Sequence, residues 1–226
     1  MNKILTISGL LLLFGVAACE KNSDTTLPLA VDNRTVTLDK DAKKPTKFNI
    51  WTTGEWTARF REKVDWASLE RLSGAGNGAI WLYYAPNPDI VRRVEVIVEA
   101  ESLADTIVFT QPGAHEPAMS FTGAQTVEAE ATEAVFGFST TLGNHLDEIE
   151  TDVSYQKYLF DDEDDEDVAE PETGWVQDIR LGQESVTVTL SPNTGNRPRR
   201  ATLNLTFVSV EGRKYTTSTG LLQMNP

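Results

Sequence analysis

Few side chains in this sequence have the types and spacing that catalysis needs. The chain contains two histidines, His115 and His145, and neither lies in a recognisable arrangement of nucleophile, base and orienting group. The single cysteine, Cys19, excludes an intrachain disulfide and a metal cage of thiolates. Carboxylates are numerous enough for glycoside hydrolysis, but two small domains leave little room for a deep cleft. We therefore expect a protein that is not an enzyme, with no catalytic residues, no bound metal and no cofactor.

An uninterrupted run of seven carboxylates, Asp161–Asp167, is the most acidic segment of the chain. Calcium takes several oxygen ligands at turn spacing, but this run lacks the glycine and the alternation of a dedicated calcium loop. Like charges in sequence repel one another and favour a solvated segment. We therefore interpret the run as a solvated loop, with a specific calcium site as the alternative.

The overall charge excludes one broad class of partner. The chain has 20 Lys and Arg against 34 Asp and Glu, a formal net charge of −14. Contacts to a phosphate backbone need a basic face, so we expect no nucleic-acid binding.

Aromatic side chains offer a different chemistry, the stacking of sugar rings. Residues 79–84 alternate so that their aliphatic side chains face a core, which turns Trp81 and Tyr83 outward. The same alternation over residues 47–51 turns Trp51 outward. If these two segments are neighbouring strands, the three rings form a flat surface about 10 Å across, suited to the C–H faces of a glycan. The alternative is that this face packs against the second domain or binds nothing.

The elements that must position these side chains are predicted to be β-strands. Short runs rich in β-branched and aromatic residues are separated by clusters of Gly, Pro, Asn and Asp, and no long segment shows a helical apolar period. The predicted strands are 36–38, 47–51, 79–84, 93–98, 106–110, 135–140, 185–190, 201–208 and 214–222. This spacing indicates an all-β chain of the β-sandwich type.

The two halves of the chain repeat one order of marker residues. The markers are a Trp, an Asn, an Arg pair and a Gln, found at Trp66, Asn87, Arg92-Arg93 and Gln111, and again at Trp175, Asn193, Arg199-Arg200 and Gln223. Equal order and similar spacing indicate an internal repeat. We predict two tandem immunoglobulin-like β-sandwiches at 28–113 and 118–226, joined by a linker at 114–117. The second sandwich is predicted to carry an acidic insertion at 143–173.

The N-terminal segment has the pattern of an exported protein. Lys3 precedes an apolar run, 4–16, that is too short for a transmembrane helix of roughly 20 residues but fits a signal peptide. The run leads into Val-Ala-Ala-Cys, which resembles the lipobox of bacterial lipoproteins. That resemblance implies removal of residues 1–18, a diacylglycerol on Cys19 and a polar tether at 19–27. The alternative is an ordinary secretory signal peptide with a cysteine near its cleavage point.

The first half also resembles a BACON domain. The resemblance is carried by Trp56-Thr57-Ala58, Trp66-Ala67-Ser68, a Gly-rich loop, Asn87, Arg93 and the closing segment 108–113. It implies an immunoglobulin-like module of the kind found in surface lipoproteins and carbohydrate-active proteins of Gram-negative bacteria. The second half is similar but divergent, because Trp175, Asn193, Arg200 and Gln223 fit and a first Trp is missing.

Several of these shared residues have a structural interpretation. We expect Trp56 and Trp66 to fill the core of the first sandwich. Arg93 and Arg200 are expected to cap strand ends. The Gly-rich segment 73–78 precedes a predicted strand, whereas a dinucleotide-binding loop precedes a helix, so we expect no phosphate site there.

Together these features predict a non-catalytic lipoprotein of the outer membrane, anchored through Cys19 and exposed at the cell surface. We expect it to bind a polysaccharide or mucin glycan through Trp51, Trp81 and Tyr83. The expected partners are that glycan, the membrane and, as a further candidate, an outer-membrane protein. The alternative is a structural spacer or protein-docking component that binds no glycan.

Overall fold

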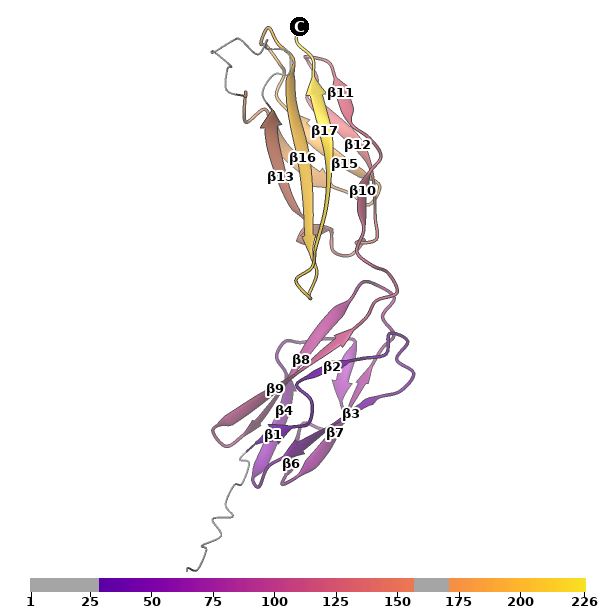
Figure 1. The fold of residues 1–226 in the computed structure, drawn as a ribbon, viewed down its shortest axis with the longest axis vertical. Helices are drawn as coiled ribbons and strands as arrows, with labels where there is room; N and C mark the ends of the chain where they lie inside the picture. The colour runs from indigo at the N-terminus through magenta and orange to yellow at the C-terminus, as the bar shows by residue number, and fades with distance from the viewer. Residues whose placement is uncertain (1–28, 157–170) are drawn as a thin grey trace, which may run out of the picture.

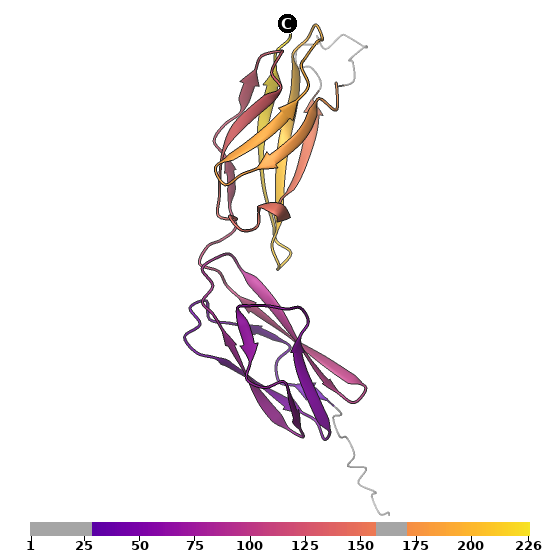
Figure 2. The same cartoon turned by 180° about the vertical axis from the view of Figure 1, so that it is seen from behind.

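The protein folds into two elongated β-lobes that lie end to end (Figure 1), as the view from behind also shows (Figure 2). The computed structural model describes residues 29–156 and 171–226. Within these residues the chain forms seventeen strands and a single-turn 3-10 helix, η1 (Leu146–Glu148). Strands β1 to β9 build the first lobe and strands β10 to β17 the second. The predicted all-β fold with two tandem sandwiches is confirmed.

The first sandwich packs a four-stranded sheet against a five-stranded sheet. The four-stranded sheet has the order β1 (Ala30–Val31), β3 (Thr46–Trp51), β7 (Gly78–Tyr84) and β5 (Ala67–Leu69). The five-stranded sheet has the order β2 (Thr35–Thr37), β9 (Leu103–Gln111), β8 (Arg92–Ala100), β4 (Glu55–Phe60) and β6 (Ser73–Ala75). Alternate residues of both sheets, among them Phe48, Ile80 and Phe109, meet in one buried core.

The second sandwich is built from two four-stranded sheets. One sheet has the order β10 (Met119–Phe121), β12 (Glu133–Thr140), β15 (Ser185–Leu190) and β14 (Val176–Leu181). The other has the order β11 (Gln125–Val127), β17 (Lys214–Gln223), β16 (Arg199–Val208) and β13 (Glu150–Gln156). Their separate core includes Phe136, Trp175 and Leu203.

The nine predicted strands coincide with nine observed strands to within three residues at each end. The predicted insertion at 143–173 is wrong over the seven residues of β13, because this strand pairs residue for residue with β16, from Glu150 opposite Thr206 to Gln156 opposite Arg200. Residues 157–170, which include the acidic run, lie outside the described residues.

Trp56 fills the core of the first sandwich, as predicted. Its side chain is 2% exposed, and its indole nitrogen donates a hydrogen bond of 3.0 Å to the carbonyl oxygen of Gly76. The ring lies so close to β6 that a Cβ on Gly74 would sit 2.3 Å from a ring carbon. Trp66 is only partly buried and packs against the edge of the same core, under the guanidinium of Arg92.

A buried glutamine closes the first sandwich. Gln111 is fully buried, and its amide nitrogen donates to the carbonyl oxygens of Asp39 (3.0 Å), Lys40 (3.3 Å) and Ala85 (3.0 Å). Its amide oxygen accepts a hydrogen bond of 2.8 Å from Nε of Arg92. One side chain therefore ties the last strand of the sandwich to two loops.

The second sandwich repeats this cluster with Gln223. The amide nitrogen of this fully buried side chain donates to the carbonyl oxygens of Ala129 (2.9 Å), Ala131 (3.1 Å) and Ser191 (3.3 Å). Its amide oxygen accepts a hydrogen bond of 3.0 Å from Nε of Arg199. The repeat seen in the sequence is thus a repeat of buried hydrogen bonds.

The arginine of each cluster is the first of its pair, Arg92 and Arg199, and the expectation that Arg93 caps a strand end is wrong. The guanidinium of Arg92 lies 4.0 Å from the ring centre of Trp66, and Arg199 lies 4.8 Å from that of Trp175. Arg93 instead points outward and pairs with Glu95 at 2.7 Å. Alternation along a strand explains the difference, since only one of two successive side chains can face inward.

Each sandwich contains one parallel strand pair, formed by its second strand and its last strand. In the first sandwich β2 runs parallel to β9, with Thr35 opposite Val108. In the second, β11 runs parallel to β17, with Gln125 opposite Leu221. The remaining strand pairs of the described residues are antiparallel.

The two sandwiches contact each other through a loop of the first. Ile90 is 4% exposed and belongs to the core cluster of the second sandwich. The carboxylate of Asp89 accepts a hydrogen bond of 3.2 Å from Asn144, and Nε2 of His145 lies 3.4 Å from the same oxygen. Gly113 in the connecting segment has no room for a side chain, because a Cβ there would lie 2.1 Å from the Asp89 carbonyl oxygen.

The contact between His145 and Asp89 is expected to weaken at alkaline pH. Nδ1 of His145 lies 2.8 Å from a carboxylate oxygen of Glu148. Burial lowers the pKa of His145, but the hydrogen bond and charge of Glu148, followed by those of Asp89, outweigh it and raise this pKa above its ordinary value of 6.5. The stabilisation is therefore complete below about pH 6.5 and is lost as the pH rises through the folded-state pKa. Burial raises the pKa of Asp89, yet bonds from the Ile90 amide, Asn144 and His145 lower it overall, so this carboxylate stays ionised in that window.

Thermal unfolding of the wild type and of His145→Gln at about pH 5.5 and about pH 8.5 measures this contact. We expect the variant to unfold at a lower temperature than the wild type at the acidic pH and at the same temperature at the alkaline pH. His115→Gln, an exposed histidine in the connecting segment, is the matched control. An equal difference between wild type and His145→Gln at both pH values would contradict the prediction.

Candidate ligand-binding surface

The outer face of the four-stranded sheet in the first sandwich carries three exposed aromatic side chains. On β7, Trp81 is 37% exposed and Tyr83 is 48% exposed, while the alternating Ile80 and Leu82 are fully buried. Trp51, the last residue of β3, is 40% exposed. The prediction that strand alternation turns these three rings outward is confirmed.

The register between β3 and β7 separates the rings more than the sequence suggested. The two strands are neighbours, as expected, with Lys47 opposite Trp81 and Ile50 opposite Gly78. Trp51 therefore lies four residues along the strands from Trp81, which corresponds to about 14 Å at ~3.4 Å per residue. The predicted compact surface about 10 Å across is wrong. We call the three rings the aromatic row.

Polar side chains flank the aromatic row on both sides. Lys47 lies opposite Trp81 on β3, and on the other side the amide of Glu70 donates a hydrogen bond of 2.9 Å to the carbonyl oxygen of Trp81. Ser68 of β5 lies opposite Tyr83. Lys47 and Glu70 therefore bring one basic and one acidic residue beside Trp81. Such a surface can stack the flat apolar face of a ligand and offer hydrogen bonds to its polar edges.

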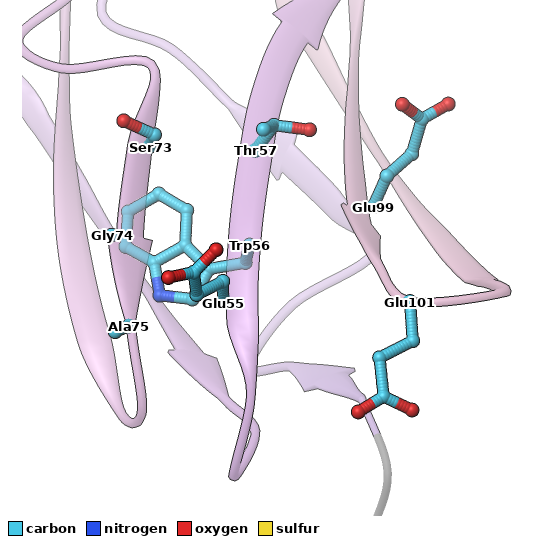
Figure 3. Close-up of a pocket in the computed structure, with 8 residues that line it drawn as sticks. All are labelled: Glu55, Trp56, Thr57, Ser73, Gly74, Ala75, Glu99 and Glu101. Carbon is cyan, nitrogen blue, oxygen red and sulfur yellow. The ribbon is translucent and has the colours of Figure 1, made fainter.

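A separate hollow lies at the end of the five-stranded sheet, and the sequence did not predict it. This open hollow has a volume of about 950 Å³ and is lined by Glu55, Trp56, Thr57, Ser73, Gly74, Ala75, Glu99 and Glu101 (Figure 3). Figure 3 shows the ring of Trp56 beside Gly74, with Glu99 and Glu101 on the opposite side and their carboxylates pointing away from each other. The lining residues come from β4, β6 and β8 and from the turn after β8, a long-range arrangement that local patterns do not encode.

The chemistry of this hollow differs from that of the aromatic row. Its only aromatic lining residue, Trp56, is 2% exposed and cannot offer a ring face to a ligand. The carboxylate of Glu99 already pairs with Arg59 at 3.0 Å. The hollow therefore presents carboxylates and hydroxyls without a stacking surface.

The other residues singled out by the sequence are not brought to either surface. His115 lies in the connecting segment and His145 at the contact between the sandwiches, while Cys19 and Asp161–Asp167 lie outside the described residues. Over residues 29–156 and 171–226, no group of three or more His, Cys, Asp or Glu side chains could hold a metal ion. The same part of the chain has no helix long and apolar enough to span a membrane.

Neither a protein-family model nor a curated protein sequence matches this chain. Solved structures with a similar arrangement include titin domains Z1 and Z2 in complex with telethonin (12% identity, 89% of this chain and 99% of that one, TM-score 0.30) and the D0-D1 domain of intimin (10%, 87% and 97%, 0.30). A third is an endo-fucoidan hydrolase of glycoside hydrolase family 107 (11% identity, 88% of this chain, TM-score 0.30). This chain spans 29% of the length of that hydrolase. With such low identities and TM-scores, the function has to be argued from the chain's own residues.

Proposed function

We propose that this protein is a non-catalytic, lipid-anchored surface protein that binds a glycan through the aromatic row. The observation that carries the proposal is the pair Trp81 and Tyr83, which stand two residues apart on one face of β7 with 37% and 48% of their surfaces exposed. A sugar ring can stack its C–H face on an aromatic ring, and its hydroxyls can bond to the polar side chains beside that ring.

The exposed rings are not needed to complete the sandwich. The opposite face of β7 already supplies Ile80 and Leu82 to the core, and both are fully buried. An exposed group of large aromatic side chains on a soluble domain marks an interaction site more often than an isolated exposed apolar residue does. The flanking Lys47 and Glu70 favour a ligand with polar edges over a wholly apolar partner surface.

The membrane attachment in this proposal comes from the lipobox-like sequence that ends at Cys19. Acyl chains on that cysteine would hold the protein in the outer membrane, with residues 19–27 as a tether. The first strand after the tether, β1, pairs with β3 so that Ala30 lies opposite Trp51. The aromatic row therefore begins where the first sandwich is tied to its anchor, which would keep a bound glycan close to the cell surface.

Binding of the mature chain to polysaccharides tests the proposal. The chain carries Cys19→Ser to keep it soluble, and the probes are laminarin, barley β-glucan, xylan, galactomannan and gastric mucin in native affinity gels. We expect retardation by at least one of them, and a loss of about tenfold or more in affinity for Trp81→Ala and for Tyr83→Ala. Leu103→Ala, which removes a similarly exposed side chain at the β8–β9 turn, is the matched control. Unchanged retardation in both aromatic variants would disprove the assigned site.

A spacer or protein-docking role is the second candidate. It is favoured by the contact between the sandwiches, where Ile90 of the first is buried in the core of the second and Asp89 bonds to Asn144. Such a contact limits the movement of one sandwich relative to the other, which suits a protein that acts as a spacer. Absence of retardation by all five probes, with the protein shown to be folded, would favour this role over glycan binding.

A further inference from the structure

The aromatic row runs along the strands of the four-stranded sheet in a definite order. Trp51 stands at the end of β3 beside β1, and Trp81 and Tyr83 follow on β7, the last of them opposite Ser68 of β5. From Trp51 to Trp81 is about 14 Å and from Trp81 to Tyr83 is about 7 Å along the strands. The row is therefore a line of stacking positions, with a wide gap and a narrow one.

We propose that the ligand is an extended glycan chain that lies along this line and is bound through internal sugars rather than through one terminal sugar. This inference rests on the proposed function and specifies the class of glycan. Trp81 and Tyr83 form the primary stacking position, and Trp51 forms a distal position that a short oligosaccharide cannot reach.

The residues between Trp51 and Trp81 support a chain across the gap. Ala79 lies between them on β7 and contributes only a methyl group, and Asn49 faces it on β3. The side-chain amide nitrogen of Asn49 donates a hydrogen bond of 2.8 Å to the carboxylate of Asp32. This exposed contact places two polar side chains beside the gap. A chain crossing here meets a small side chain below and hydrogen-bonding groups at its edge.

The two stacking positions predict how affinity depends on chain length. A disaccharide occupies Trp81 and Tyr83 alone, whereas a longer chain adds the contact with Trp51 without a second loss of translational freedom. Affinity should therefore rise by about tenfold or more between short and long oligosaccharides and then level off. The rise should depend on Trp51 and on no other residue of the row.

Isothermal titration of the mature Cys19→Ser chain with a length series tests this inference. The series runs from disaccharide to hexasaccharide and is prepared by partial hydrolysis of a polysaccharide that retards the protein in the native gels. The proteins compared are the chain itself, Trp51→Ala, Trp51→Phe and the control Leu103→Ala. We expect Trp51→Ala to bind disaccharide normally and to lose the gain for hexasaccharide, and Trp51→Phe, which keeps a ring, to restore most of it.

The outcomes separate this inference from the function on which it rests. Equal affinities for disaccharide and hexasaccharide, or an unchanged length dependence in Trp51→Ala, would overturn the extended-chain inference and leave glycan binding standing. Equal loss for all lengths in Trp51→Ala would also overturn it, since Trp51 would then belong to one compact site. Native gels without retardation by any of the five probes, with the protein shown to be folded, would remove the proposed function itself.

Discussion

Replacing Gln223 with leucine is expected to lower the free energy of unfolding of the second sandwich by about 3–5 kcal/mol. Leucine has a similar volume but cannot form the four hydrogen bonds of this fully buried amide. The carbonyl oxygens of Ala129, Ala131 and Ser191 each lose one donor, and Nε of the Arg199 guanidinium, a side chain that is 5% exposed, loses its acceptor. Arg199 keeps its pairing with Glu172 and Ser191, so the cost comes from the unmade bonds rather than from an isolated charge.

Chemical denaturation followed by circular dichroism measures this effect. The chain has two sandwiches, so the unfolding transition that belongs to the second sandwich must be identified before its free energy of unfolding is calculated. Gln111→Leu removes the equivalent cluster of the first sandwich and should shift the other transition by a similar amount. Gln177→Leu, an exposed glutamine on β14, is the matched control and should change little. Overlapping unfolding curves for wild type and Gln223→Leu would show that the cluster contributes nothing.

Replacing Cys19 with alanine is expected to move the protein from the membrane to the soluble fraction. Each buried methylene of an acyl chain contributes ~0.8 kcal/mol, so two or more chains bind durably while none leaves an acidic polypeptide without an anchor. The negative charge of the chain, −14 in all, would add repulsion from an anionic lipid surface.

Cell fractionation and the intact mass of the mature protein test this prediction together. The wild type should sediment with membranes through a high-salt wash and carry the added mass of its lipids, and Cys19→Ala should do neither. Ser23→Ala, in the same tether, should behave as the wild type does. A membrane-bound Cys19→Ala, or a wild type of unmodified mass, would contradict lipid anchoring.

Local patterns were sufficient to predict most of the long strands and the faces of their side chains. Residues 79–84 alternate so strongly that the outward orientation of Trp81 and Tyr83 followed from the sequence alone. Trp56 was placed in the core because a large apolar side chain gains most from burial there. Strand β13 was missed because its inward positions, Val153 and Tyr155, are separated by polar residues and lie close to the acidic run.

Features that depend on pairing between distant segments could not be predicted in this way. The separation of Trp51 from Trp81 follows from the register of β3 on β7, and a shift of two residues would have kept the same faces with different distances. The choice of Arg92 over Arg93 in the buried cluster depends on which side chain faces inward at the strand end. The bond between Asp89 and Asn144 joins two sandwiches and has no local signature.

The parallel pairs β2–β9 and β11–β17 determine how this protein carries a mechanical load. When the first and last parts of a sandwich are pulled in opposite directions, two parallel strands that join them must slide along each other. Their hydrogen bonds are then strained together in shear. If the same two strands were antiparallel, the force would separate them from one end and break their hydrogen bonds one after another. A force applied between the first and last strands of either sandwich would therefore be resisted by hydrogen bonds that break as a group.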